Sequence, residues 1–144
     1  MANNQQPTVA KWRGDRWTFI ATTPTGHTLV MDSLHDDKDD GPSPMELLLT
    51  ALAGCAGTTV LSILQKKREP VEGLEVQVDG KRALEHPKVY IDIELVYRVY
   101  GTVKPESVER AIELSEEKYC GVSATLRKTA TFTHRYEILP CKSA

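Results

Sequence analysis

The first third of the chain alternates apolar and polar residues in short stretches bounded by turn residues. Residues 8–12, 16–22 and 27–32 each show strand-like alternation, and Gly14 and Gly26 lie in the turns between them. Short alternating stretches with such turns predict strands that pair antiparallel with their neighbours. We therefore expect a three-stranded meander at the N-terminal end.

A polar loop over residues 33–42 follows and holds four aspartates. Aligned on Gly41, an EF-hand calcium loop would need oxygen ligands at its third and twelfth positions. These positions are Lys38 and Leu47, so the pattern fails twice. A run of charges of this kind is typical of a solvated loop.

A long helix is predicted over residues 44–68. Ser43 is a suitable N-cap, Pro44 suits the first helical position, and Pro70 stops the helix. Three basic residues, 66–68, favour its C-terminal end.

No charged residue occurs between Leu47 and Leu64, so the helix could span a membrane or form a buried core. Several threonines, glycines and a serine interrupt the apolar run, and the flanking strands need a core, which favours the buried helix. A chain of this size rarely covers such a helix alone. The small residues 53–57 around Cys55 allow close helix packing, so we expect a second subunit to complete the core.

The second half predicts an α+β arrangement. Alternation over residues 74–79 and 89–99, around a turn at 84–88, indicates a long antiparallel hairpin. Pro105 opens a second helix, a short helix follows at 121–127, and a last strand covers 129–138. The apolar face of the second helix is expected to hold Val108, Ala111, Ile112, Ser115 and Tyr119. With no linker along the chain, we expect one domain over residues 1–144.

Composition and charge narrow the class of protein. The 144 residues are 40 % apolar and 26 % charged with a net charge of -2, typical of a globular chain and unfavourable for nucleic acid as the main partner. The N-terminus lacks the basic start and apolar stretch of a signal peptide. Three cysteines are too few for a disulfide scaffold, so we expect a reducing, cytoplasmic compartment.

Two cysteines are candidates for chemistry. Cys55 lies mid-helix between small residues that leave room for a reactant, although a free cysteine is often just a small buried hydrophobe. Cys120 lies at the junction of two helices, and helix N-termini stabilise thiolates. Spacing alone does not pair them. Cys141, near the C-terminus, is assigned no role.

Other motifs give no site. The chain has no Cys-x-x-Cys, no nucleophile elbow and no phosphate-binding glycine loop, and its four histidines lack zinc-ligand spacing, so we expect no cofactor and no metal. His134 alternates with aromatic residues and is expected to be half-buried in a sheet. Arg13 and Arg16 flank a turn and are most simply solvated.

Two segments together resemble a known family. They are residues 41–47, Gly-Pro-Ser-Pro-Met-Glu-Leu, leading to Cys55, and residues 117–123, Glu-Lys-Tyr-Cys-Gly-Val-Ser, which contain Cys120. With the order of the expected elements, they are similar to the OsmC/Ohr family over nearly the whole chain, closest to its YhfA-like subgroup.

This resemblance implies a cytoplasmic, intertwined homodimer in which antiparallel sheets wrap around two long central helices. It also implies a peroxiredoxin-like, thiol-dependent peroxidase that reduces organic hydroperoxides in oxidative-stress defence. By carry-over, Cys55 is the peroxidatic thiol and Cys120 the resolving thiol, and an external dithiol restores both. Neither nucleic acid nor a membrane is an expected partner.

The family also places an arginine, held by an acid, beside the peroxidatic thiol. Arg16 is the best match and Arg13 the second. The family's acid stands ten residues before the cysteine, where this chain has Met45. Glu46 is the alternative acid, but nine steps of about 100° place it on the opposite side of the helix from Cys55, where it could simply be a first-turn charge. A non-catalytic or small-ligand-binding dimer with inert thiols therefore stays an open alternative.

Overall fold

The computed structural model describes residues 6–33 and 39–140, and these form two compact units that divide after Leu48. The aspartates at 36 and 37, Lys38 and Cys141 lie outside the described residues. The prediction of a single domain over residues 1–144 stays a prediction.

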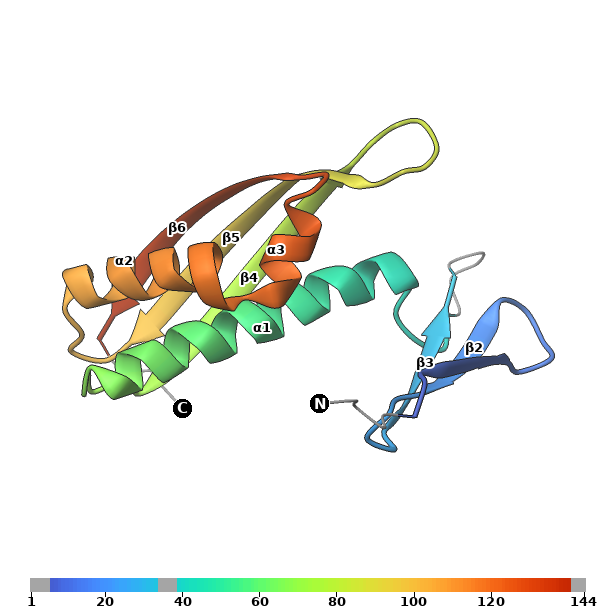
Figure 1. Ribbon diagram of the computed structural model, residues 1–144, viewed down its shortest axis with the longest axis horizontal. Coiled ribbons are helices and arrows are strands. Elements are labelled where there is room, and N and C mark those ends of the chain that lie inside the picture. The colour runs from blue at the N-terminus through green and yellow to red at the C-terminus, as the bar shows by residue number, and fades with distance from the viewer. Residues whose placement is uncertain (1–5, 34–38, 141–144) are drawn as a thin grey trace. The chain divides into compact units, whose positions relative to one another are not determined.

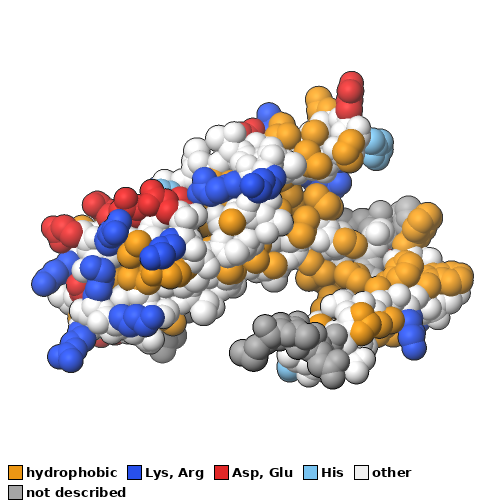
Figure 2. All heavy atoms as spheres, in the orientation of Figure 1, with side chains coloured by type: hydrophobic (Ala, Val, Ile, Leu, Met, Phe, Trp, Pro, Cys, Tyr) orange, Lys and Arg blue, Asp and Glu red, His pale blue; other side chains and the backbone are white. Residues whose placement is uncertain are grey.

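The first unit is the expected meander. Strands β1 (Val9–Trp12), β2 (Thr18–Thr22) and β3 (Thr28–Asp32) form an antiparallel sheet in the order β1-β2-β3. Gly26 adopts a φ of 85° in the turn before β3, a conformation that glycine adopts without strain. The unit leaves large apolar side chains at its surface, and Figure 2 shows hydrophobic side chains gathered there. Trp12 and Trp17 are each 59 % exposed.

Helix α1 (Pro44–Lys66) begins and ends close to the predicted positions. Its start is a capping box, in which the Glu46 N–H donates to Ser43 Oγ (3.2 Å) and the Ser43 N–H donates to Glu46 Oε2 (2.6 Å). Lys66 lies in the last turn, where a positive charge suits the helix dipole.

One stripe of α1 is buried within the second unit. It consists of Leu52, Ala56, Val60 and Leu64, spaced four residues apart. A Cβ on Gly57 would lie 3.4 Å from Val76 Cγ2, so α1 packs closely on the following strand. By length and composition alone, α1 could also cross a membrane: an 18-residue window has a mean hydropathy of 2.0, and 22 % of it is buried.

The second unit has a three-stranded sheet of mixed direction. Strands β4 (Gly73–Arg82) and β5 (Tyr90–Tyr100) form the predicted antiparallel hairpin. The last strand, β6 (Thr131–Leu139), pairs with β5 in parallel, so the expectation of purely antiparallel sheets is wrong here. The reason is the helical crossover between β5 and β6, which returns the chain to the end of the sheet where β5 began.

The crossover consists of α2 (Pro105–Leu114), the π-helical turn η1 (Ser115–Tyr119) and α3 (Gly121–Leu126). Together with α1 it covers one face of the sheet (Figure 1). Four of the five residues expected on the inner helical face are buried, but Tyr119 is 53 % exposed. The wider π-helical turn changes the angular spacing after Leu114, and this rotates Tyr119 outward.

Candidate thiol site

The structure brings two thiols together within the second unit. Cys55 lies on α1 and is half-buried, whereas Cys120 is only 3 % exposed, and both are free thiols. The two thiols are neighbours, because Cys55 is among the groups that raise the pKa of the Cys120 thiol. A peroxide that reaches this pair meets the Cys55 sulfur at the more accessible position.

Backbone groups on both sides hold Cys120 in place. Its N–H donates to the Ser115 carbonyl (2.8 Å), which closes the π-helical turn. Its sulfur caps α3 and accepts a hydrogen bond from the Ser123 N–H (3.4 Å). The position at a helix junction, noted in the sequence, is therefore an N-cap position.

The pKa of the Cys120 thiol is raised from 9.0 to about 11. Burial is the main cause, followed by the hydrogen bond to Cys55 and the negative charge that Cys55 can carry, while N–H groups of Ser123 and Val122 oppose the shift. At pH 7 only about one Cys120 in 10⁴ is then a thiolate. Cys120 is thus a protonated partner to Cys55 in the reduced protein.

A cluster of polar side chains beside Cys120 escaped the sequence analysis. The Glu116 carboxylate, on η1, contacts Arg127 Nη2 (3.1 Å) and His134 Nδ1 (3.0 Å). The His134 side chain is 40 % exposed, so the expectation of a half-buried histidine is wrong, and its carboxylate contact was not anticipated either. These residues come from different elements and share no motif, so no sequence signal could have grouped them.

Tyr97 lies edge-on to the His134 ring, with ring centroids 6.5 Å apart. Among the described residues, its buried hydroxyl has no hydrogen-bond partner. Burial raises the pKa of Tyr97, and the negative charges of Glu116 and of Cys120, once it is deprotonated, raise it further, whereas Arg127 lowers it. The hydroxyl therefore stays protonated in the folded protein at neutral pH.

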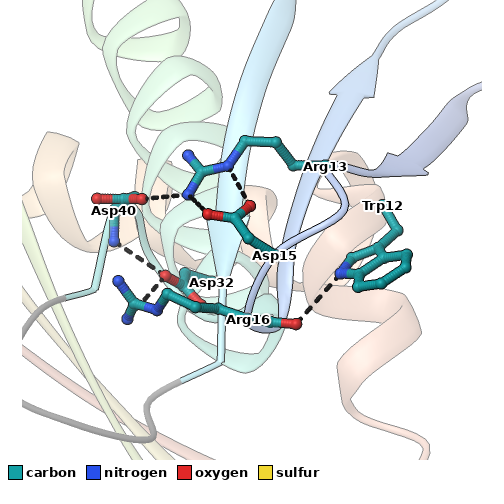
Figure 3. A network of polar contacts seen from close by, with 6 residues as sticks. All are labelled: Trp12, Arg13, Asp15, Arg16, Asp32 and Asp40. Carbon is teal, nitrogen blue, oxygen red and sulfur yellow. Dashed lines mark hydrogen bonds and ion pairs between the residues drawn. The ribbon is translucent and has the colours of Figure 1, made fainter.

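Both candidate arginines lie in the first unit and are exposed, as expected, but they are also ion-paired (Figure 3). Arg13 binds Asp15 and Asp40 at 2.7 Å each. Arg16 Nη2 lies 3.3 Å from Asp32 Oδ2, and its backbone has a φ of 50°, which non-glycine residues rarely adopt. The tight turn before β2 thus aims both side chains at acidic partners.

Asp32 is the acid beside Arg16 that the sequence analysis missed. It ends β3, pairs in register with Thr18, and is 1 % exposed. The Asp40 N–H donates to its Oδ2 (3.1 Å), and this hydrogen bond lowers the pKa of Asp32, with the Arg16 charge acting in the same direction against burial. An aspartate on a strand otherwise rich in apolar residues was the available signal.

Glu46, the acid considered from the sequence, takes part in the capping box of α1. The hydrogen bonds from Ser43 lower the pKa of this carboxyl group. Its position matches the interpretation as a first-turn charge. Because Arg16 and Glu46 belong to the first unit and Cys55 to the second, the approach of Arg16 to the thiol stays a prediction.

Within residues 6–33 and 39–140, no group of three or more histidine, cysteine or acidic side chains could hold a metal ion.

Comparison with known proteins gives consistent matches. A family model described as OsmC-like protein matches residues 36–135. Protein YhfA of Escherichia coli strain K12 is 42 % identical over 123 residues, which cover 85 % of this chain and 90 % of YhfA. The crystal structure of a hypothetical protein from Aquifex aeolicus has a TM-score of 0.83 at 32 % identity, covering 94 % of this chain and 96 % of that one.

More distant structures share the fold. The organic hydroperoxide resistance protein OhrB of Bacillus subtilis matches with a TM-score of 0.63 at 18 % identity, covering 90 % of this chain and 97 % of OhrB. The segment that the family model matches, residues 36–135, extends from the loop before α1 into β6 and includes both Cys55 and Cys120. On these matches, the chain belongs to the OsmC-like protein family, which includes hydroperoxide-resistance proteins.

Proposed function

We propose that this protein is a thiol-dependent peroxidase that reduces organic hydroperoxides, with Cys55 as the peroxidatic and Cys120 as the resolving thiol. The observation that carries the proposal is the proximity of a half-buried thiol on α1 to a buried thiol at the α3 N-cap, close enough for Cys55 to raise the Cys120 pKa. A family that includes hydroperoxide-resistance proteins supports the choice of substrate class.

In the first step, the Cys55 thiolate attacks one oxygen of the hydroperoxide. The O–O bond breaks, an S–O bond forms, and the alkoxide takes up a proton and leaves as an alcohol. Cys55 becomes a sulfenic acid. The exposure of the two thiols supports this assignment, because Cys120 is buried and its raised pKa keeps it protonated.

In the second step, the Cys120 sulfur attacks the Cys55 sulfur. An S–S bond forms, the S–O bond breaks, and the leaving hydroxide combines with the Cys120 proton to give water. A dithiol reductant then exchanges with the Cys55–Cys120 disulfide. It becomes oxidised itself and returns both cysteines as thiols.

Activation of Cys55 is assigned to Arg16, held by an acid, in the functional assembly. The ion pair of Arg16 with the buried Asp32 supports this role, because it offers a positioned guanidinium despite Met45 at the family's acid position. Glu46 is a second candidate acid. A cation beside a thiol favours the thiolate.

The assembly that we propose is a cytoplasmic homodimer in which α1 packs against its copy. Two observations support it: among the described residues, the buried side chains of the apolar α1 form a single stripe, and the first unit exposes Trp12 and Trp17. Sedimentation at micromolar concentration is the test. A well-folded monomer would contradict the dimer, and sedimentation only in the presence of detergent would favour the membrane alternative.

The peroxidase proposal is tested with reduced protein carrying Cys141→Ser, so that two thiols remain. One equivalent of cumene hydroperoxide should consume both thiols of this parent. In Cys120→Ser, one thiol should be lost and dimedone should trap a sulfenic acid at Cys55. In Cys55→Ser, hydroperoxide consumption should stop.

Unchanged consumption by Cys55→Ser would overturn the proposal and favour a binding protein with inert thiols. Hydrogen peroxide serves as the comparison oxidant, and we expect it to react more slowly than cumene hydroperoxide.

A further inference from the structure

A pair of hydroxyl groups joins α1 to the π-helical turn next to the two cysteines. Thr59, one turn after Cys55, and Ser115, the first residue of η1, form a hydrogen bond between their Oγ atoms. Ser115 is fully buried and Thr59 is half-buried. A polar contact in such a place is retained only when both groups are satisfied, because burying an unpaired hydroxyl is costly.

The pair completes a continuous hydrogen-bonded path between the cysteine backbones. The Thr59 hydroxyl donates to the carbonyls of Cys55 (3.1 Å) and Ala56 (3.0 Å). Its single hydrogen is then used, so the Ser115 hydroxyl donates to Thr59 Oγ1. The Ser115 carbonyl in turn accepts from the Cys120 N–H (2.8 Å). Two side chains thus connect the two cysteine residues.

The π-helical turn couples the position of Cys120 to that of Ser115. Its i→i+5 hydrogen bond is the one that ends on Cys120, and Ser115 provides the accepting carbonyl. A shift of Ser115 relative to α1 therefore moves Cys120 relative to Cys55. The Ser123 N–H holds the Cys120 sulfur from the other side.

We propose that Thr59 and Ser115 are positioning residues for disulfide formation between Cys55 and Cys120. They fix the alignment of the Cys120 sulfur with the Cys55 sulfur but do not touch the hydroperoxide. The proposal rests on the proposed function for its kinetic consequence. Removing the hydroxyl pair should slow the step that forms the S–S bond and releases water, and should leave the attack of Cys55 on the hydroperoxide unchanged.

The main test compares Thr59→Val, which keeps the branched shape and removes the hydroxyl, with Thr59→Ser, which keeps the hydroxyl. Thr58→Val is the matched control, because the Thr58 hydroxyl makes the same kind of bond to the Gly54 carbonyl (2.8 Å) on the exposed side of α1. Sedimentation verifies that this variant keeps the oligomeric state of the parent, since the exposed side of α1 is the proposed dimer interface. All variants carry Cys141→Ser. Rapid mixing with cumene hydroperoxide, quenching into dimedone, and mass spectrometry follow the sulfenic acid and the disulfide separately.

Disulfide formation should slow by about tenfold to a hundredfold in Thr59→Val, the range expected for small misplacements of reacting groups. Thr59→Ser and Thr58→Val should resemble the parent. Ser115→Ala should match Thr59→Val, and the double variant should be no slower than either, because the same hydrogen bond is already lost. A parental rate in Thr59→Val, or equal slowing in Thr58→Val, would overturn the proposal.

A second measurement needs no hydroperoxide and separates this proposal from the proposed function. In a glutathione redox buffer, the equilibrium constant for the Cys55–Cys120 disulfide reports how well the two sulfurs are aligned. It should fall about tenfold or more in Thr59→Val, where alignment is lost. If the parent fails to consume hydroperoxide but this shift is observed, the peroxidase proposal fails and the positioning role stands. No shift would count against the positioning role.

Discussion

The pKa of the Cys120 thiol depends directly on burial and on the neighbouring Cys55, so it provides a test of the thiol pair. This pKa is about 11 rather than 9.0, first because of burial and then because of Cys55. At pH 7 the thiolate fraction is about 10⁻⁴, a hundredfold below that of an ordinary thiol, and each pH unit raises it about tenfold until the pKa is reached. Replacing Cys55 by alanine removes both its hydrogen bond and its charge, so the Cys120 pKa should fall while burial keeps it above 9.0.

The assay is carbon NMR of protein with ¹³Cβ-labelled cysteine and Cys141→Ser, titrated between pH 7 and pH 12. The Cys120 resonance should show its midpoint near pH 11 in the parent and at a lower pH in Cys55→Ala. Far-UV circular dichroism at each pH confirms that the fold persists. A parental midpoint at or below pH 9, or one unmoved by Cys55→Ala, would refute the reasoning from burial and from the contact between the thiols.

Other predictions concern stability and are measured by urea unfolding. Leu64→Ala, in the fully buried stripe of α1, should cost about 2–5 kcal/mol, whereas Leu84→Ala, 93 % exposed, should change stability by less than about 0.5 kcal/mol. Ser43→Ala should cost about 1 kcal/mol because it removes the N-cap, and an unchanged stability would contradict the capping role of Ser43. Cys120 and Tyr97, whose pKa values are raised, keep protons that the unfolded chain releases, so the free energy of unfolding should fall as pH rises above about 9.

Much of the secondary structure could be predicted because local patterns determine it. The capping residue Ser43, the uncharged run after Leu47 and the stop at Pro70 define α1 without knowledge of its neighbours. The strict alternation over β5 likewise predicts a strand with one covered face, and a short turn fixes its antiparallel pairing with β4.

The direction of β6 could not be predicted in this way. Alternation identifies the face that a strand buries, but it is the same for parallel and antiparallel neighbours. The π-helical turn was hidden for a similar reason, since residues 115–119 have the composition of an ordinary helix and only the exposed Tyr119 reveals the wider turn.

The sequence shows which residue types form the candidate site, but it does not show which of these residues are in contact. Cys55 and Cys120 are candidates from the sequence because one lies mid-helix among small residues and the other lies at a helix junction. Only the family resemblance implies that the two act together. Thr59 is one of several polar residues on α1, and nothing in the sequence distinguishes it from Thr58. Only the packing of α1 against η1 gives Thr59 a partner and leaves Thr58 at the surface.

The meeting of two sulfurs so distant in sequence also has a thermodynamic consequence. A covalent bond between residues 55 and 120 would close a loop of about 65 residues and restrict the unfolded ensemble, which the chain-entropy relation equates to about 4 kcal/mol at 25 °C. The oxidised protein should therefore melt at a higher temperature than the reduced protein. The melting temperature would then report the redox state, and the disulfide form, which persists until the dithiol reductant acts, would be the more thermostable form.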